Sequence, residues 1–87
     1  MIYQVTAQTL DIASSTTLAP EKKYGAWMAV NQGTNTANVM GYELQPGEGI
    51  DMLKAVPAGS YWNTPIRILI NPGALVRITR LQYQLTK

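Results

Sequence analysis

The sequence contains no cysteine, no histidine and no phenylalanine among its 87 residues. Without cysteine the chain forms no disulfide bonds, which usually stabilise small secreted domains. The lack of both cysteine and histidine excludes zinc fingers, zinc enzymes and the Ser-His and Cys-His pairs of nucleophilic catalysis. The sequence therefore predicts a protein that is not an enzyme and that binds no metal or cofactor.

Charge is also scarce. Charged residues make up 14% of the chain, against about a quarter in a typical soluble domain. Asn, Gln, Ser and Thr supply 23 positions, and 46% of the residues are hydrophobic. A chain of this size buries only about 60–65% of its surface on folding, so its own core is marginal. We expect a homo-oligomer, with a trimer favoured, that covers part of its surface with partners; a polar-coated monomer is the alternative.

The few charges are unevenly distributed. Residues 1–54 carry three cations and five anions, whereas residues 55–87 carry Arg67, Arg77, Arg80 and Lys87 and no anion. The net charge of +2 is too small to predict a nucleic-acid or membrane-surface partner. No stretch approaches 18 consecutive apolar residues and no targeting segment is visible, so we expect one domain over 1–87 and no membrane span.

Alternation of apolar and polar residues predicts strands from end to end. The predicted strands are 2–10, 26–31, 37–44, 66–70 and 74–86, and residues 50–56 form a strand or at most one helical turn. Polar connections are expected at 14–17 and 20–23. The apolar positions change parity near Thr9 and again near Thr79 and Arg80, which predicts a β-bulge at each place. Residues 75–85 also fit a loosely helical spacing, but Val, Ile, Thr and Tyr favour a strand.

Turn residues separate the predicted strands. Pro46-Gly47 is the strongest turn, because proline presets the first turn position and glycine accepts a positive φ at the next. The turns at 31–33 and 71–73 predict that 26–31 pairs with 37–44 and that 66–70 pairs with 74–86 as hairpins. Pro57 and Gly59 break the chain again. This pattern predicts an all-β fold, a small jelly-roll-like sandwich or barrel of six to eight short antiparallel strands.

The candidate interface residues follow from these elements. If 66–70 and 74–86 form a hairpin, Arg67, Arg77 and Arg80 lie in one basic stripe that contacts a protein surface, a phosphate or only solvent. Core packing is the commonest use of tryptophan, but Trp62, with Tyr61 beside it, lies among turn residues that suggest partial exposure, so an interface or ligand role is the other interpretation. Trp27, inside an apolar run, is predicted to be core.

The only clustered carboxylates are Glu43, Glu48 and Asp51, and they lie around the Pro46-Gly47 turn. A general acid and base or a calcium site would need more ligands in one loop. These residues are therefore interpreted as solvated turn charges.

Two motifs carry a resemblance to a known group of proteins. Residues 31–34 read N-x-G-T at the end of a predicted strand, residues 44–50 read L-x-P-G-E-x-I, and residues 59–62 read G-x-x-W. With this arrangement, over about residues 24–70, the chain resembles small β-rich structural proteins of bacteriophage virions. The resemblance implies a jelly-roll-like sandwich that serves as a capsid decoration, cement, vertex or fibre-base component, typically as trimers or pentamers. It transfers no functional residue.

Two hypotheses of function follow. The first is a non-enzymatic structural protein of the virion, assembled in the host cytoplasm, that binds the capsid surface and itself. The second is a recognition module of a tail fibre or baseplate that binds carbohydrate or a receptor through Trp62, Tyr61 and Asn63. A cupin-like enzyme is excluded, because cupin metal sites need histidine.

Overall fold

The structure is a computed structural model that describes residues 2–21, 24–52 and 62–86. Its strands are β1 (Ile2–Ile12), β2 (Thr16–Leu18), β3 (Ala26–Asn31), β4 (Ala37–Val39), β5 (Tyr42–Leu44), β6 (Gly49–Asp51), β7 (Ile66–Ile70) and β8 (Val76–Thr86). Within these ranges no residue is helical, so the helical alternative for 75–85 is wrong. The predicted strand at 50–56 is described only as far as Met52, and the predicted break at Pro57 and Gly59 lies outside the described residues.

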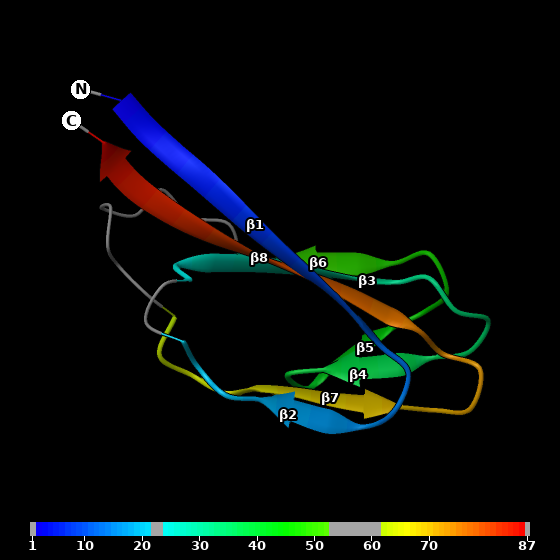
Figure 1. Ribbon diagram of the computed structural model, residues 1–87. Helices are drawn as coiled ribbons and strands as arrows, with labels where there is room; N and C mark the ends of the chain where they lie inside the picture. Colours follow the sequence, from blue (N-terminus) through cyan, green and yellow to red (C-terminus); the bar gives the residue numbers. More distant parts are fainter. Residues whose placement is uncertain (1, 22–23, 53–61, 87) are drawn as a thin grey trace.

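The strands follow one simple topology. β1 pairs with β8, β2 with β7, β3 with β6 and β4 with β5, all antiparallel. In this nested pairing the first four strands form one arm of a long hairpin and the last four form the other, with the turn between β4 and β5. Two further contacts, β3 with β8 and β4 with β7, roll the hairpin into two sheets with the orders β1-β8-β3-β6 and β2-β7-β4-β5. A hairpin rolled up in this way is a jelly roll, so the all-β sandwich is confirmed, as an open sandwich and not a closed barrel (Figure 1).

The core lies between the two sheets. Its fully buried apolar side chains include Trp27 and Ile78 from one sheet and Val39 and Ile68 from the other. Trp27 is 1% exposed, which confirms its predicted place in the core. Burying side chains of this size stabilises a domain by about 1.5–3 kcal/mol each.

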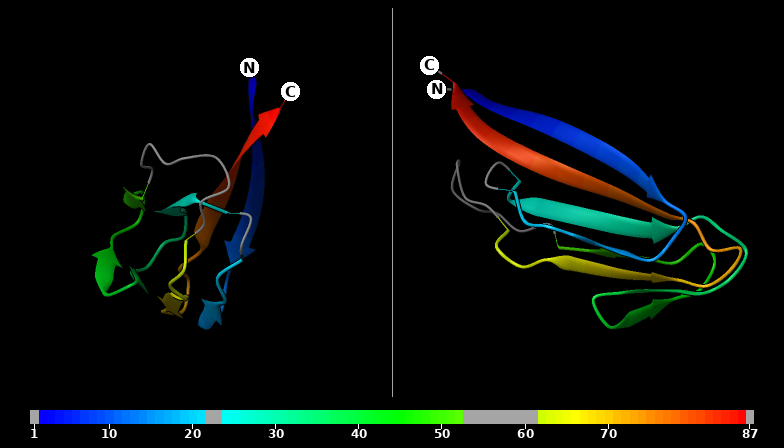
Figure 2. Two further views of the ribbon diagram at one scale, coloured as in Figure 1. Left: turned by 90° about the vertical axis from the view of Figure 1, so that its left-hand side faces the viewer. Right: turned by 60° about the horizontal axis from the view of Figure 1, so that its bottom comes forward.

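β1 and β8 form the longest feature of the molecule. They pair without interruption, from Ile2 opposite Thr86 to Ile12 opposite Val76, so the two predicted bulges are wrong. β3 accompanies β8 only as far as Leu81. Beyond it, residues 2–6 and 82–86 continue as a two-stranded ribbon past the sandwich, with the ends of the chain at its tip (Figures 1 and 2).

The parity change that suggested bulges has a different cause. The inward positions of β8 hold the buried Val76 and Ile78 and then Arg80, which lies opposite Gln8 and receives no apolar partner there. The Arg80 Nε donates a hydrogen bond to Gln8 Oε1 at 3.0 Å. A polar pair thus closes the end of the core, and the strands run on in the same register.

The connections between sheets correct the predicted pairings. β3 and β4 lie in different sheets, as do β7 and β8, so residues 32–36 and 71–75 cross between sheets and both predicted hairpins are wrong. The predicted strand 37–44 is a hairpin of β4 and β5 that turns at Met40 and Gly41, with φ of 55° and 88°. Two consecutive left-handed residues form the type I′ turn that suits the twist of a hairpin. Thr16–Leu18, expected to lie in a connection, forms β2.

The proline-glycine turn is confirmed. Glu48 N donates a hydrogen bond to Gln45 O at 2.9 Å, and Gly47 has a φ of 87°. Proline at the first central position and a left-handed glycine at the second make this a type II turn. The turn brings β6 back alongside β3.

Asn31, the last residue of β3, connects the segments at one end of the sandwich. It is fully buried. Its Nδ2 donates hydrogen bonds to Asn35 O at 2.7 Å and to Leu44 O at 3.0 Å, and its Oδ1 accepts one from Gly33 N at 3.0 Å. A buried amide with these bonds is satisfied and fixes the segments around it.

The two crossing segments lie directly against each other at this end. Gln32 N donates to Leu75 O at 2.6 Å and Thr34 N donates to Gly73 O at 2.8 Å. Gly33 lies between these bonds, and a Cβ atom there would be 2.4 Å from Gly73 O. Only glycine fits such an approach of two backbones.

Candidate interaction surface

The predicted basic stripe does not form. Arg67 lies on β7 and Arg77 on β8, in different sheets. Both side chains are exposed, and the residues before and after each of them are buried between the sheets. The two arginines therefore lie on the opposite outer faces of the sandwich, and a single flat contact cannot cover both.

Arg77 is neutralised by an acidic residue on the neighbouring strand. It lies opposite Asp11 in the β1–β8 register, with Arg77 Nε 2.9 Å from Asp11 Oδ1 and Nη2 3.4 Å from Oδ2. The hydrogen bond and charge of Arg77 hold the pKa of Asp11 below its usual value, and Asp11 raises the pKa of Arg77. Both groups are solvent-exposed, so the pair is a weak surface contact.

Arg80 is a buried residue and not a surface cation. Only 8% of it is exposed. Besides its bonds to Gln8, its guanidinium lies 3.5 Å from a carboxylate oxygen of Glu21 and 4.7 Å from the ring centre of Tyr24. Arg80 thereby joins β8 to the segment that precedes β3, and its stem covers the end of the core. This arrangement gives Arg80 a structural role.

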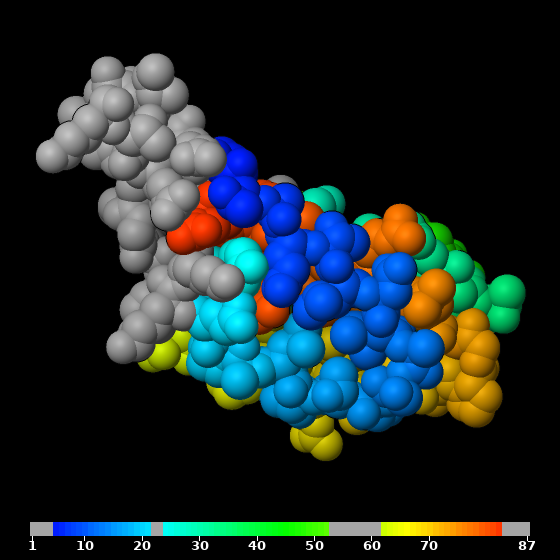
Figure 3. Space-filling view, in the orientation of Figure 1, coloured from blue at the N-terminus to red at the C-terminus, as the bar shows by residue number. Residues whose placement is uncertain are grey.

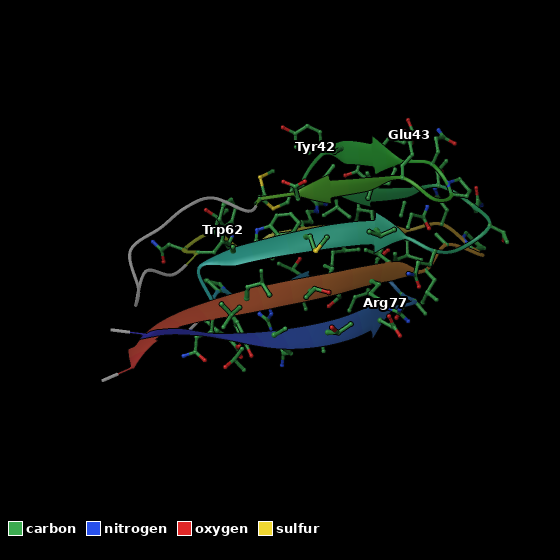
Figure 4. All side chains as sticks on the ribbon, turned by 90° about the horizontal axis from the view of Figure 1, so that it is seen from above. Tyr42, Glu43, Trp62 and Arg77 are labelled. Carbon is green, nitrogen blue, oxygen red and sulfur yellow. The ribbon has the colours of Figure 1, made fainter. Side chains whose placement is uncertain are left out.

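Trp62 packs against the core. Its ring meets that of Trp27 edge to face, with centroids 5.7 Å apart and planes at 81°, and its backbone N donates to Tyr24 O at 2.7 Å. The side chain is half-buried. Trp62 and Arg77 lie well apart, toward opposite ends of the sandwich (Figure 4). The structure therefore separates the residues that the sequence grouped, and Tyr61 lies outside the described residues.

The outer face of the β2-β7-β4-β5 sheet carries a different group of side chains. Directly opposite residues form two rows, one of Thr17 and Arg67, the other of Leu69, Asn38 and Glu43. We call these five residues the β7 face. Leu69 is 43% exposed, and no ion pair of Arg67 is found among the described residues.

Tyr42 is a further exposed side chain of the edge strand β5, but it lies on the other side of the sheet from the β7 face. It is 56% exposed and lies opposite the buried Val39, whereas its neighbour Glu43 belongs to the β7 face (Figure 4). Arginine is enriched at the centres of protein interfaces, so Arg67 is the main candidate contact of the β7 face. The β7 face was not predicted from the sequence, because the face depends on the pairing of β7 with β4. The alternation of Arg67 and Leu69 with isoleucines was the signal that both side chains lie on the outer face of this strand.

One small pocket lies beside Trp62. It is lined by Ala19, Pro20, Glu21, Tyr24, Trp62, Thr64, Ile66 and Arg80, and its volume of about 10 Å³ holds no more than one water molecule. A sugar ring does not fit this space, so the pocket does not support carbohydrate binding through Trp62. Across residues 2–21, 24–52 and 62–86 there is also no group of three carboxylates that could hold a metal ion.

Comparisons with protein families, with curated proteins and with solved structures find no match for this chain. Among the described residues, no helix is long and apolar enough to cross a membrane. Any functional proposal therefore rests on the fold and on its exposed surfaces.

Proposed function

We propose that this chain is a non-enzymatic structural protein of a virus particle, a decoration, cement or vertex component that binds the capsid surface and other copies of itself. The jelly-roll topology supports this proposal, since the fold is used by viral capsid domains, lectins and cupins. A cupin metal site needs histidine, which the chain lacks. The pocket beside Trp62, with a volume of about 10 Å³, does not enclose a saccharide.

The β7 face is the observation that carries the proposal. Arg67 and Leu69 lie two residues apart on one strand and face the same side of the sheet, and both are exposed. Arginine is one of the residue types enriched among energetic hot spots, where truncation costs about 2 kcal/mol or more, and Leu69 adds exposed apolar surface beside it. We expect a carboxylate of the capsid surface opposite Arg67, surrounded by apolar atoms that cover Leu69.

The composition of the particle tests the virion assignment. The experiment is mass spectrometry of purified particles of the virus whose genome encodes the chain, with copy number measured against the major capsid protein. Hundreds of copies per particle indicate a shell component, and a handful indicate a vertex or tail component. Absence of the chain from the particles overturns the assignment.

Two matched arginine variants test the surface. Arg67→Ala should weaken binding to particles at least tenfold. Arg77 is also exposed but lies on the other sheet, so Arg77→Ala should bind as the parent does if the β7 face makes the contact. Equal binding by the parent and Arg67→Ala overturns the β7 face. The same assay tests the sequence-based interpretation that Arg77 belongs to the interface, since a loss of binding in Arg77→Ala would support it.

Trp62→Ala separates the interface role of Trp62 from its core role. The variant removes the ring that packs on Trp27, which typically costs about 3–5 kcal/mol. Circular dichroism shows whether it stays folded. A folded variant that fails to bind particles supports the interface role, and an unfolded variant assigns Trp62 to the core.

A further inference from the structure

The four edges of the two sheets differ greatly in length. The strand orders place β1 and β6 at the edges of one sheet and β2 and β5 at the edges of the other. β2, β5 and β6 have three residues each, whereas β1 has eleven. Short edge strands are one of the ways in which proteins prevent unwanted pairing with other chains. The fold therefore protects three edges and leaves one long edge.

β1 also lacks the other protective devices. It contains no proline and no lysine, and its continuous register with β8 shows no bulge. Its single charged residue, Asp11, is paired with Arg77. Ile, Val, Thr and Tyr, which favour strands, supply most of the remaining positions. The sequence of β1 therefore has none of these features that discourage a second neighbour, and among the described residues β8 is its one neighbour.

The outer side of β1 is open within the described part of the chain. β8 is its only strand neighbour there. Figure 3 looks at this side of the molecule, where residues 5–18, in blue, form the surface over most of the sandwich. In an antiparallel strand every second residue directs both its N–H and its C=O away from the neighbour. About ten backbone groups of β1 are therefore available to a further strand.

We propose that β1 pairs antiparallel with β1 of a second copy of this chain and joins two sandwiches across a twofold axis. The proposal deepens the self-association in the proposed function by naming its surface. The other described edge strands, β2, β5 and β6, have only three residues each. Among the described edges, only β1 of a second copy is long enough to pair with β1 along all its eleven residues. Pairing two such strands forms about ten hydrogen bonds, the number found in a typical specific interface.

The faces of β1 restrict the register. Gln8, Leu10 and Ile12 are half-buried on the side of the core, whereas Val5, Ala7 and Thr9 are exposed on the other side. Directly opposite residues lie on the same face of a sheet, and residues of β1 on the same face are either all even-numbered or all odd-numbered. In a β1–β1 contact the two residue numbers of each pair must therefore add to an even number. Centring the contact on the strand places Ala7 opposite Ala7 and Val5, which is 54% exposed, opposite Thr9.

Charge is compatible with this register. The centred contact puts Asp11 of each copy opposite Tyr3 of the other. At about 3.4 Å per residue the two Asp11 positions are then about 27 Å apart, well beyond the screening length of about 8 Å in physiological salt. Within β1 itself, residues 2–12, no like charges oppose the contact. A strand edge accepts one neighbour, so this contact produces dimers, whereas the sequence favoured a trimer; the mass of the assembly decides between them.

The absence of cysteine allows a direct test with a single introduced thiol. In Ala7→Cys the two sulfur-bearing residues face each other across the axis, with Cα atoms about 4.5–5.5 Å apart, within the range of disulfides. We expect a disulfide-linked dimer on mild oxidation. Thr17→Cys, on the exposed three-residue edge strand β2, is the control and should stay monomeric on a non-reducing gel.

A charge variant tests the same contact without oxidation. Ala7→Lys places two ammonium groups at the axis, and Thr17→Lys is again its control. Sedimentation velocity at high micromolar concentration should find dimers for the parent and Thr17→Lys, and folded monomers, checked by circular dichroism, for Ala7→Lys.

A monomeric or trimeric parent overturns the proposal, as does Ala7→Lys dimerising as well as the parent, or cross-linking of Thr17→Cys as efficient as that of Ala7→Cys. These measurements use the isolated chain. Dimers from a chain that is absent from particles would refute the virion assignment alone, and monomers from a chain that is present would refute the β1 contact alone.

Discussion

Replacing Asn31 tests whether the buried amide holds one end of the sandwich together. In Asn31→Ala the side chain loses both donors and its acceptor, so Leu44 O, Asn35 O and Gly33 N lose a partner. A buried polar group left unpaired costs about 1–3 kcal/mol, and water can reach the groups that are only partly buried. We expect a loss of about 2–4 kcal/mol from a total stability of about 4–13 kcal/mol for a chain of this length.

Urea unfolding, followed by the fluorescence of Trp27 and Trp62, measures this loss at one fixed protein concentration, because association adds to apparent stability. Asn63→Ala is the control, since Asn63 is exposed, and it should change the free energy of unfolding by less than about 0.5 kcal/mol. A loss in Asn31→Ala no larger than that of Asn63→Ala would refute the reasoning.

Asn31→Asp tests the direction in which stability changes with pH. It keeps the shape but presents a carboxylate to two carbonyl oxygens, so burial should raise the pKa of the introduced carboxyl above its unfolded value. A group with a raised pKa contributes stability that is present below its unfolded pKa and is lost as the pH rises through its folded pKa. The free energy of unfolding of the variant should therefore be closer to that of the parent near pH 4 than at pH 7. A variant that is closer to the parent at pH 7 would contradict the role of Asn31 Nδ2 as a donor to the two carbonyl oxygens.

Three further predictions concern the charged groups. NMR titration should find the pKa of Asp11 below its usual value of about 3.9 in the parent and closer to that value in Arg77→Gln; an equal pKa in both proteins would argue against the pair. Because the folded pKa of Asp11 is depressed, the stability that the pair contributes is present above the unfolded pKa and is lost as the pH falls through the folded pKa. Arg80→Met, which keeps the apolar stem, should be more stable in urea than Arg80→Ala, for which we expect a loss of about 2–4 kcal/mol; equal losses would show that the charge and not the packing matters. EDTA should leave the urea midpoint unchanged, because the chain has no histidine or cysteine and few carboxylates; a lowered midpoint together with stoichiometric metal would refute this expectation.

Local signals predicted the strands and turns well, and they failed where the answer depended on distant partners. The turn at Pro46-Gly47 and the strand Ala26–Asn31 are both present, because proline, glycine and alternating apolar residues act over a few positions. Whether residues 71–75 close a hairpin or cross to another sheet depends on strands far away in the sequence. Asn31 illustrates a further limit, since its partners come from loops that meet only in the folded chain.

The candidate site was predicted less well for the same reason. Arg67, Arg77 and Arg80 look alike in the sequence, but one is exposed without an ion-pair partner among the described residues, one is paired and one is buried. Position 80 faces inward because β8 keeps its register past Ile78, which the change in apolar parity concealed.

The nested pairing of the strands also favours one order of events during folding. The β4–β5 hairpin closes over two residues, whereas the β1–β8 pair joins Ile2 to Thr86, almost the whole chain. Closing a short loop costs less entropy than closing a long one, and each inner pair shortens the loop that the next pair must close. Folding should therefore proceed from the middle of the chain outwards. During synthesis β1 leaves the ribosome before β8, so the long edge exists only once β8 has been made.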